Sequence, residues 1–179
     1  MRAPTSIAAL ALAVLLLSGC LPQQSAVTPT PEPTSTPVFA SEEEALAAAT
    51  AAYAAYLAVS DQIGADGGAN PERLKPLVTA EWLAKEVGAF KEFSSTGWRQ
   101  SGLTTLRSSA LQQFSDDSVT LYVCTDANET RFYDSSGADV TPAVRQTESS
   151  LEVSFAIGAS ADGRLLLEGN DPWAAESFC

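Results

Sequence analysis

Residues 41–64 read SEEEALAAATAAYAAYLAVSDQIG, and they predict one long helix at the start of the folded part of this 179-residue chain. Ser41, with Glu44 three residues later, is the pattern of a capping box at a helix start. Apolar and aromatic side chains then recur near helical spacing, at positions 46, 49, 53, 56, 57 and 63. Gly64 and the run Asp66-Gly67-Gly68 predict the end of the helix.

Two shorter helices are expected next, and each has its own start signal. Asn70-Pro71 places a capping residue before a proline, which suits the first position of a helix. Pro76 should shorten that helix, because proline removes a backbone donor. Thr79 is expected to cap the third helix, with an apolar stripe at 83, 87 and 90 and a break at residues 94–97.

The rest of the chain has the alternation of strands. Residues 98–114 predict one long strand with bulges, and residues 116–118 predict a turn. Residues 119–126 then alternate, with Val119, Leu121 and Val123 on one face and Tyr122 and Cys124 on the other. A hairpin loop at residues 127–129 is expected to lead into a strand over residues 130–133.

The clearest period-two pattern lies at positions 151, 153, 155 and 157, which are Leu, Val, Phe and Ile. Asp162-Gly163 should turn this strand into a last one over residues 164–168. Helices first and antiparallel strands afterwards indicate an α+β domain, with N-terminal helices packed on one face of an antiparallel sheet, which the family resemblance below implies is curved.

This order of elements resembles the NTF2-like family, which includes the SnoaL-like proteins. The resemblance covers residues 41–179 and rests on the order of the elements, since no residue motif supports it. It implies a cone-shaped sheet that curls around a pocket. A plain α+β two-layer sandwich is the structural alternative.

Ahead of this domain, residues 20–40 comprise Cys20 and a tether rich in Pro, Ser and Thr. Such a composition cannot bury enough apolar surface to fold. Its prolines favour an extended course of about 3.1 Å per residue, so that the tether could reach roughly 60 Å. We expect it to hold the domain away from a membrane; the alternative is a proline-rich ligand for a partner domain.

Residues 1–19 have the order of a secretory signal, with Arg2, an apolar run over 7–17 and then small residues. The run is shorter than the roughly 20 apolar residues that span a bilayer. Leu17-Ser18-Gly19-Cys20 resembles the lipobox of bacterial lipoproteins, and those of high-GC Gram-positive bacteria are similar in layout. The resemblance implies cleavage before Cys20 and a diacylglyceryl group on its thiol, with fatty acids such as palmitate. A plain secretory signal with an incidental cysteine is the alternative.

A lipid on Cys20 would place the domain on the extracytoplasmic face of the cell membrane, and charge and composition restrict what it does there. Removing the signal leaves 9 basic and 22 acidic residues, a net charge of −13. This acidity argues against nucleic acid as a partner. The chain has no histidine, which excludes Ser-His-Asp and Cys-His catalysis and the common zinc sites. We therefore expect no catalytic residues, metal or cofactor, and a binding or accessory domain whose protein or small-molecule partner the sequence does not name.

An isomerase- or cyclase-like enzyme is the alternative function, and only the family resemblance implies it. Ketosteroid-isomerase-like members use an acidic base beside a tyrosine donor in the pocket. Tyr53, Tyr56 and Asp61 could share one face of the first helix and take these roles. The simpler interpretation is that the tyrosines fill the core and that Asp61 is solvated at the helix end.

Four weaker patterns favour ordinary structural roles. Residues 134–139 resemble a calcium loop only loosely, because the distal glutamate of an EF-hand is missing, and a solvated turn is expected. Asn128-Glu129-Thr130 matches a glycosylation acceptor but lies in an expected loop. Trp98 and Trp173 could rim a pocket, although core filling is the better interpretation for isolated aromatic residues.

Cys124 and Cys179 are predicted to form a disulfide. Export would place the domain where disulfides persist. With Cys20 occupied by lipid, one pair remains among the three cysteines. Such a bond would hold Trp173 and Phe178 against the sheet. Two buried free thiols are the alternative.

Overall fold

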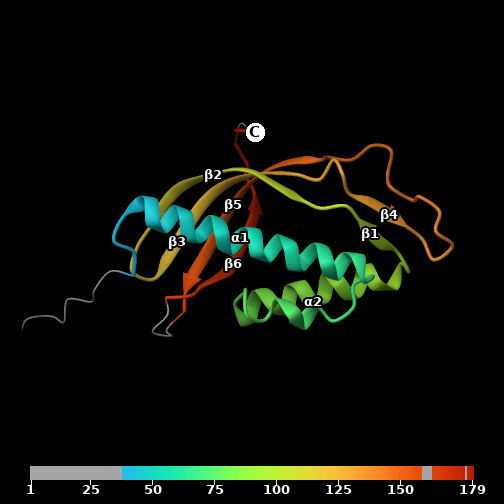
Figure 1. Cartoon of the computed structure of the whole chain (residues 1–179), viewed down its shortest axis with the longest axis horizontal. Helices are drawn as coiled ribbons and strands as arrows, with labels where there is room; N and C mark the ends of the chain where they lie inside the picture. The colour runs from blue at the N-terminus through green and yellow to red at the C-terminus, as the bar shows by residue number, and fades with distance from the viewer. Residues whose placement is uncertain (1–37, 159–162, 176) are drawn as a thin grey trace, which may run out of the picture. The chain divides into compact units, whose positions relative to one another are not determined.

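The structure, a computed structural model, describes residues 38–158, 163–175 and 177–179, and it belongs to the expected α+β class (Figure 1). The helices are α1 (Glu42–Ala65), the 3-10 helix η1 (Pro71–Leu74) and α2 (Ala80–Ser95). The strands are β1 (Arg99–Ser101), β2 (Thr105–Phe114), β3 (Ser118–Asp126), β4 (Arg131–Tyr133), β5 (Glu148–Ile157) and β6 (Leu165–Pro172). The predicted signal, Cys20 and most of the predicted tether lie outside the described residues.

Both ends of α1 are set by the signals predicted from the sequence. The Ser41 hydroxyl accepts a hydrogen bond from the Glu44 N–H at 3.2 Å, and the Glu44 carboxylate accepts one from the Ala40 N–H at 2.8 Å. At the other end, Gly68 has a φ of 82°, and its N–H donates to the Ile63 carbonyl at 2.8 Å. Gly68 is required here, because a Cβ would also press against the backbone carbonyl of Phe90.

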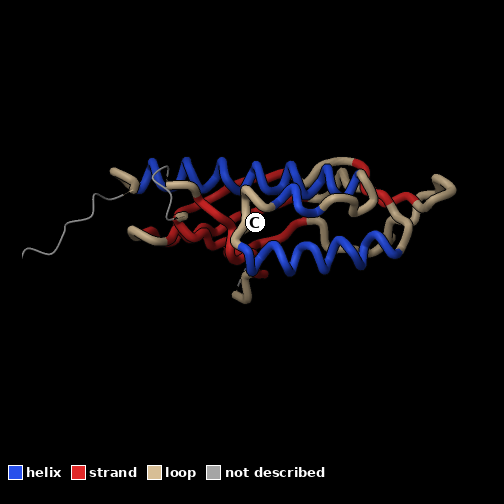
Figure 2. Tube along the Cα trace, turned by 90° about the horizontal axis from the view of Figure 1, so that it is seen from below, coloured by secondary structure: helices blue, strands red, loops and turns tan. Residues whose placement is uncertain are grey.

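The second expected helix is only a single 3-10 turn, η1, and Leu74 at its end is fully buried. The capping of α2 is as predicted, since the Thr79 hydroxyl accepts a hydrogen bond from the Trp82 N–H at 3.3 Å. Helices α1 and α2 run alongside one another in two perpendicular views, and η1 contacts both (Figures 1 and 2).

The larger sheet is antiparallel and has the strand order β2-β3-β5-β6, so that β3 and β5 are its central strands. Val119 pairs with Phe155, and Leu121 pairs with Val153. All four side chains are buried, whereas Tyr122, the next residue after Leu121, is only partly buried. The predicted alternation in these two strands is confirmed.

The single strand expected over residues 98–114 is divided into β1 and β2. Gly102 lies between them with a φ of 80°, a conformation that favours glycine. A Cβ at this position would collide with the backbone carbonyl of Glu129, so the break depends on a close approach between two backbone segments. Strand β2 does carry the expected irregularities, between Leu106 and Ser108 and between Leu111 and Gln113.

The expected hairpin between residues 119–126 and 130–133 is wrong. Strand β4 pairs with β1, with Gln100 opposite Phe132, and the two form a separate small sheet. Arg145 holds the connecting segment in place, because its guanidinium donates to the Ala127 carbonyl at 3.0 Å and to the Thr130 carbonyl at 2.8 Å. These contacts lead the chain away from β3 after residue 126.

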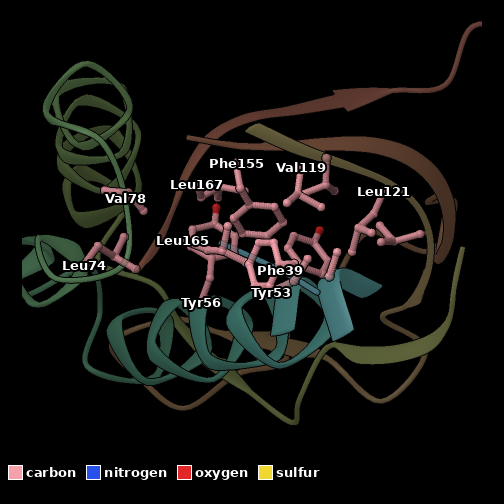
Figure 3. Packing of buried hydrophobic residues seen from close by; sticks show 14 of the residues in the cluster. Phe39, Tyr53, Tyr56, Leu74, Val78, Val119, Leu121, Phe155, Leu165 and Leu167 are labelled. Atoms are coloured by element: carbon pink, nitrogen blue, oxygen red, sulfur yellow. The ribbon is translucent and has the colours of Figure 1, made fainter. Parts of the chain in front are cut away.

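One hydrophobic core joins α1 to the inner face of the larger sheet. Figure 3 shows Val119, Leu121 and Phe155 from the strands pointing into the space that Tyr53 enters from the helix. The largest fully buried side chains are Tyr53, Phe155, Ile63, Leu74, Leu121, Leu167, Val119, Val123 and Val153. Strand β6 contributes to this core and runs to Pro172, beyond the end expected from the sequence; Asp162, in the turn predicted before it, lies outside the described residues.

Phe39 belongs to the same core, although its position falls in the predicted tether. Its side chain is 8 % exposed (Figure 3). The adjacent Ala40 N–H is held by Glu44, which fixes the chain as it enters α1. The packed part of the chain therefore begins before Ser41.

Candidate functional site

The two tyrosines of α1 lie inside the domain and bond to different elements. The Tyr53 hydroxyl donates to the Asn170 side-chain oxygen on β6 at 3.1 Å. The Tyr56 hydroxyl donates to the Glu86 carboxylate on α2 at 2.8 Å. Their rings are stacked, with centroids 5.9 Å apart. The pair thus fills the core, as the simpler sequence interpretation expected, and ties α1 to both neighbouring layers.

Burial raises the pKa of both tyrosines above the ordinary range, because a phenolate would lose its hydration in the core. The nearby negative charge of Glu86 raises the pKa of Tyr56 further. Both hydroxyls therefore remain neutral donors at ordinary pH. Each of them also has an acceptor within the protein.

Asp61 has a different environment on the same helix. Its side chain is 7 % exposed and accepts three hydrogen bonds. The donors are the Gln100 amide at 2.7 Å, the Thr104 N–H at 2.8 Å and the Thr104 hydroxyl at 3.1 Å. Asp61 is therefore a buried acceptor that joins α1 to β1 and to the residues before β2. The expectation of a solvated helix-end residue is wrong.

Glycine at position 64, which has no side chain, makes the contact between Gln100 and Asp61 possible. Gly64 lies one turn after Asp61, and a Cβ there would be 2.9 Å from the Gln100 amide oxygen. Gln100 can reach Asp61 because the helix surface beside it is bare. The donors come from residues 39 and 43 positions away in the chain, which is why the α1 sequence alone does not reveal this site.

The structure therefore does not bring together the three residues of the enzyme alternative. Tyr53 and Tyr56 bond toward β6 and α2, whereas Asp61 bonds toward β1 and the start of β2. Across the described part of the chain, no hydrogen bond links Asp61 to either tyrosine.

An open groove of about 290 Å³ lies directly beside Asp61. One wall is the α1 surface, and the other is the segment that enters β2. Leu103 stands on the second wall with 65 % of its surface exposed. The lining residues are Ala54, Leu57, Ala58, Asp61, Gln62, Leu103, Thr104 and Leu106. A mostly apolar groove with one buried carboxylate has the usual composition of a binding site.

The outer face of the larger sheet carries the predicted cysteine pair. The sulfur atoms of Cys124 and Cys179 lie at disulfide distance, and their Cα atoms are 5.5 Å apart. Trp173 and Phe178 pack on Tyr122, with ring centroids 4.7 and 5.6 Å from it. Trp173, Phe178 and Cys179 are thus held against β3, as the sequence predicted for Trp173 and Phe178.

The loop at residues 134–139 is a self-contained turn. Asp134 accepts hydrogen bonds from the Ser136 hydroxyl at 2.6 Å, the Ser136 N–H at 2.8 Å and the Ala138 N–H at 3.0 Å. The hydrogen bond from the Ser136 hydroxyl lowers the pKa of the Asp134 carboxylate most, and the bond from the Ala138 N–H lowers it further. Within the described ranges, no group of three or more His, Cys, Asp or Glu residues could hold a metal ion.

The two remaining patterns have structural surroundings. The Asn128 backbone carbonyl accepts a hydrogen bond from Arg145 at 3.3 Å, and the residue lies in the exposed loop after β3. Trp98 contacts Phe132 at 6.2 Å between ring centroids, and Phe93 contacts the same ring at 6.0 Å. Trp98 thus packs between the end of α2 and the small sheet.

None of the helices in residues 38–158, 163–175 and 177–179 is long and apolar enough to cross a membrane. Comparison of the chain with protein-family models, with curated proteins and with solved structures found no match.

Proposed function

We propose that this chain is a bacterial lipoprotein, anchored through Cys20 to the extracytoplasmic face of the cell membrane, whose domain binds a partner and catalyses no reaction. The lipobox-like sequence at residues 17–20 supports the anchor. The Cys124–Cys179 pair at disulfide distance supports export, because disulfides persist outside the cytoplasm.

The observation that carries the non-catalytic part is the arrangement of the polar groups of α1. Tyr53 and Tyr56 both have acceptors inside the protein, and Asp61 is held by Gln100 and Thr104 on another side of the helix. The isomerase- or cyclase-like alternative needs an acid and a tyrosine in one pocket. The core between α1 and the sheet is instead filled by large side chains, including Tyr53 and Phe155.

An NTF2-like cone is the finer fold that we propose for the domain. Its support is the order of elements, with a long helix, shorter helices and then an antiparallel sheet that shares a core with the long helix. In this proposal the interior of the cone is occupied by protein side chains, and binding takes place on the outside. The groove beside Asp61 is the candidate place.

Metabolic labelling with a clickable fatty acid tests the anchor. The wild-type protein should take up the label, and Cys20→Ala should lose it. Cys179→Ala is the matched control, because it removes a cysteine that is not in the lipobox-like sequence and should keep the label. Added protease should also digest the domain in intact protoplasts. A label that persists in Cys20→Ala, or a domain that resists protease until the membrane is lysed, contradicts the proposal.

A further inference from the structure

Asp61 gives the groove a negative charge that its hydrogen bonds to the protein do not neutralise. Asp61 is a nearly buried carboxylate, and its three partners are two N–H groups and one hydroxyl. Of the described Lys and Arg side chains, none lies within ion-pair distance of it. A buried charge that is hydrogen-bonded but not paired with a cation keeps a strong attraction for one.

The geometry leaves room for such a cation. The Asp61 oxygen Oδ1 accepts two of the three hydrogen bonds, and Oδ2 accepts only the one from the Thr104 N–H. A carboxylate has about four acceptor positions, so Oδ2 can accept a further donor. Asp61 also lines the groove, so a ligand in the groove reaches this carboxylate.

The walls of the groove define the rest of the ligand. Ala54, Leu57 and Ala58 form a small apolar stripe on α1, and Leu103 faces them from the other wall with much of its side chain exposed. An apolar stem can lie between these walls while a charged head meets Asp61. Lysine has this form, because it carries an ammonium group on a four-carbon stem.

We infer that this groove binds a lysine side chain of a partner protein, with the ammonium group at Asp61 and the stem along the alanines of α1 and Leu103. The net charge of the mature chain, −13 from 9 basic and 22 acidic residues, favours a basic protein surface as the partner. This inference rests on the proposed binding function and names the chemistry that the domain recognises.

A titration of the full-length protein in detergent micelles, followed by ¹H–¹⁵N NMR, tests the inference. The first probe is Nα-acetyl-lysine N-methylamide, and the second is its norleucine counterpart, which has the same stem without the ammonium group. We expect the lysine probe to shift the Thr104 amide signal saturably, since that N–H donates to Asp61. The norleucine probe should bind at least tenfold more weakly. Equal binding of the two probes, or no shift at Thr104, overturns the inference.

Variants locate the site. Asp61→Asn removes the charge and should weaken lysine binding at least tenfold. Because this change also disturbs the bond from the Thr104 N–H, Leu103→Ser provides a second variant at an exposed position, and binding should weaken several-fold. Glu92→Gln removes an exposed charge on α2 and should leave binding unchanged. A Leu103→Ser protein that binds like the wild type overturns the inference, even if Asp61→Asn does not fold.

Two further probes show whether the ammonium group comes from a small amine or from a protein, and the fatty-acid label on Cys20 tests the anchor separately. Free n-butylammonium and a short lysine-containing peptide are titrated in the same way. Binding of the small amine without binding of the peptide contradicts a partner protein as the source. If neither probe binds while Cys20 still takes up the fatty-acid label, the groove inference fails and the proposed membrane anchoring stands.

Discussion

The two faces of the larger sheet are held in different ways. On the inner face, Val119, Leu121 and Phe155 are almost completely buried against α1, and the contacts are apolar. On the outer face, Tyr122 and Cys124 meet Trp173, Phe178 and Cys179 near the end of the chain. One face is stabilised by burial over a large area, and the other by a cysteine pair and a few aromatic contacts.

This difference predicts two kinds of damage. A cavity on the inner face removes contacts that hold the whole domain, because every element around the core loses packing at once. Loss of the cysteine pair should instead loosen Trp173, Phe178 and Cys179 and leave the inner face packed.

The largest effect is expected for Phe155→Ala. Phe155 is 1 % exposed, so the substitution removes buried area and leaves a cavity, and the free energy of unfolding should fall by about 4 kcal/mol. Phe178→Ala is the matched change on the outer face, where the side chain is 42 % exposed, and should cost about 1 kcal/mol. Denaturant unfolding measures both. Equal losses would remove the distinction between the two faces.

Reduction of the cysteine pair should have the next largest effect. Cys124 and Cys179 are 55 residues apart in sequence, and opening a loop of that size should lower the stability by at most about 4 kcal/mol. Unfolding curves with and without reductant measure the loss, with the Cys124→Ala/Cys179→Ala double variant as the reagent-free control. Hydrogen exchange should rise first at the Trp173 amide, which donates to the Ser150 carbonyl at 2.8 Å. The lower global stability also raises exchange in β3 and β5, so an increase at Trp173 that is no larger than the increase in those strands would contradict local loosening.

Phe39 extends the inner face beyond the start of α1. Phe39→Ala should lower the stability by about 2 kcal/mol, because the side chain contributes to the core. Val38→Ala, at a neighbouring residue that is 39 % exposed, should cost less than about 1 kcal/mol. Thermal unfolding of the two variants measures the difference. A neutral Phe39→Ala would return the boundary of the packed domain to Ser41, as the sequence suggested.

The smallest effect concerns the tyrosine hydroxyls and depends on pH. The unfolded tyrosines titrate near pH 10, and the folded ones at higher pH because burial raises their pKa. Above about pH 10 the unfolded state therefore loses protons first, and the stability should fall as the pH rises. Tyr53→Phe should cost about 1 kcal/mol at neutral pH and make this decline shallower. An unchanged slope would show that other groups cause it.

Local signals predicted the elements well. The capping box at Ser41 and the glycines after residue 64 defined α1, because caps and stops depend on a few neighbouring residues. The alternation in β3 and β5 identified the buried face, because each strand has one face against the core. The pairing of Cys124 with Cys179 followed from counting cysteines and from the expected compartment.

Contacts between distant segments were not predictable from these patterns. The break at Gly102 depends on the backbone of Glu129, and the position of β4 depends on Arg145. The role of Asp61 depends on Gln100 and Thr104, which are far from it in the chain. For the same reason the groove beside Asp61 had no signature in the sequence of α1.

Mass spectrometry of the protein extracted from its own membrane, without reductant, tests the central claim most directly. We predict an N-terminal peptide that begins at Cys20 and carries the mass of a diacylglyceryl group. We also predict that the peptides containing Cys124 and Cys179 are joined until reductant is added. An unmodified Cys20 within an uncleaved N-terminal peptide, together with two free thiols at Cys124 and Cys179, would contradict both the lipid anchor and the extracytoplasmic location.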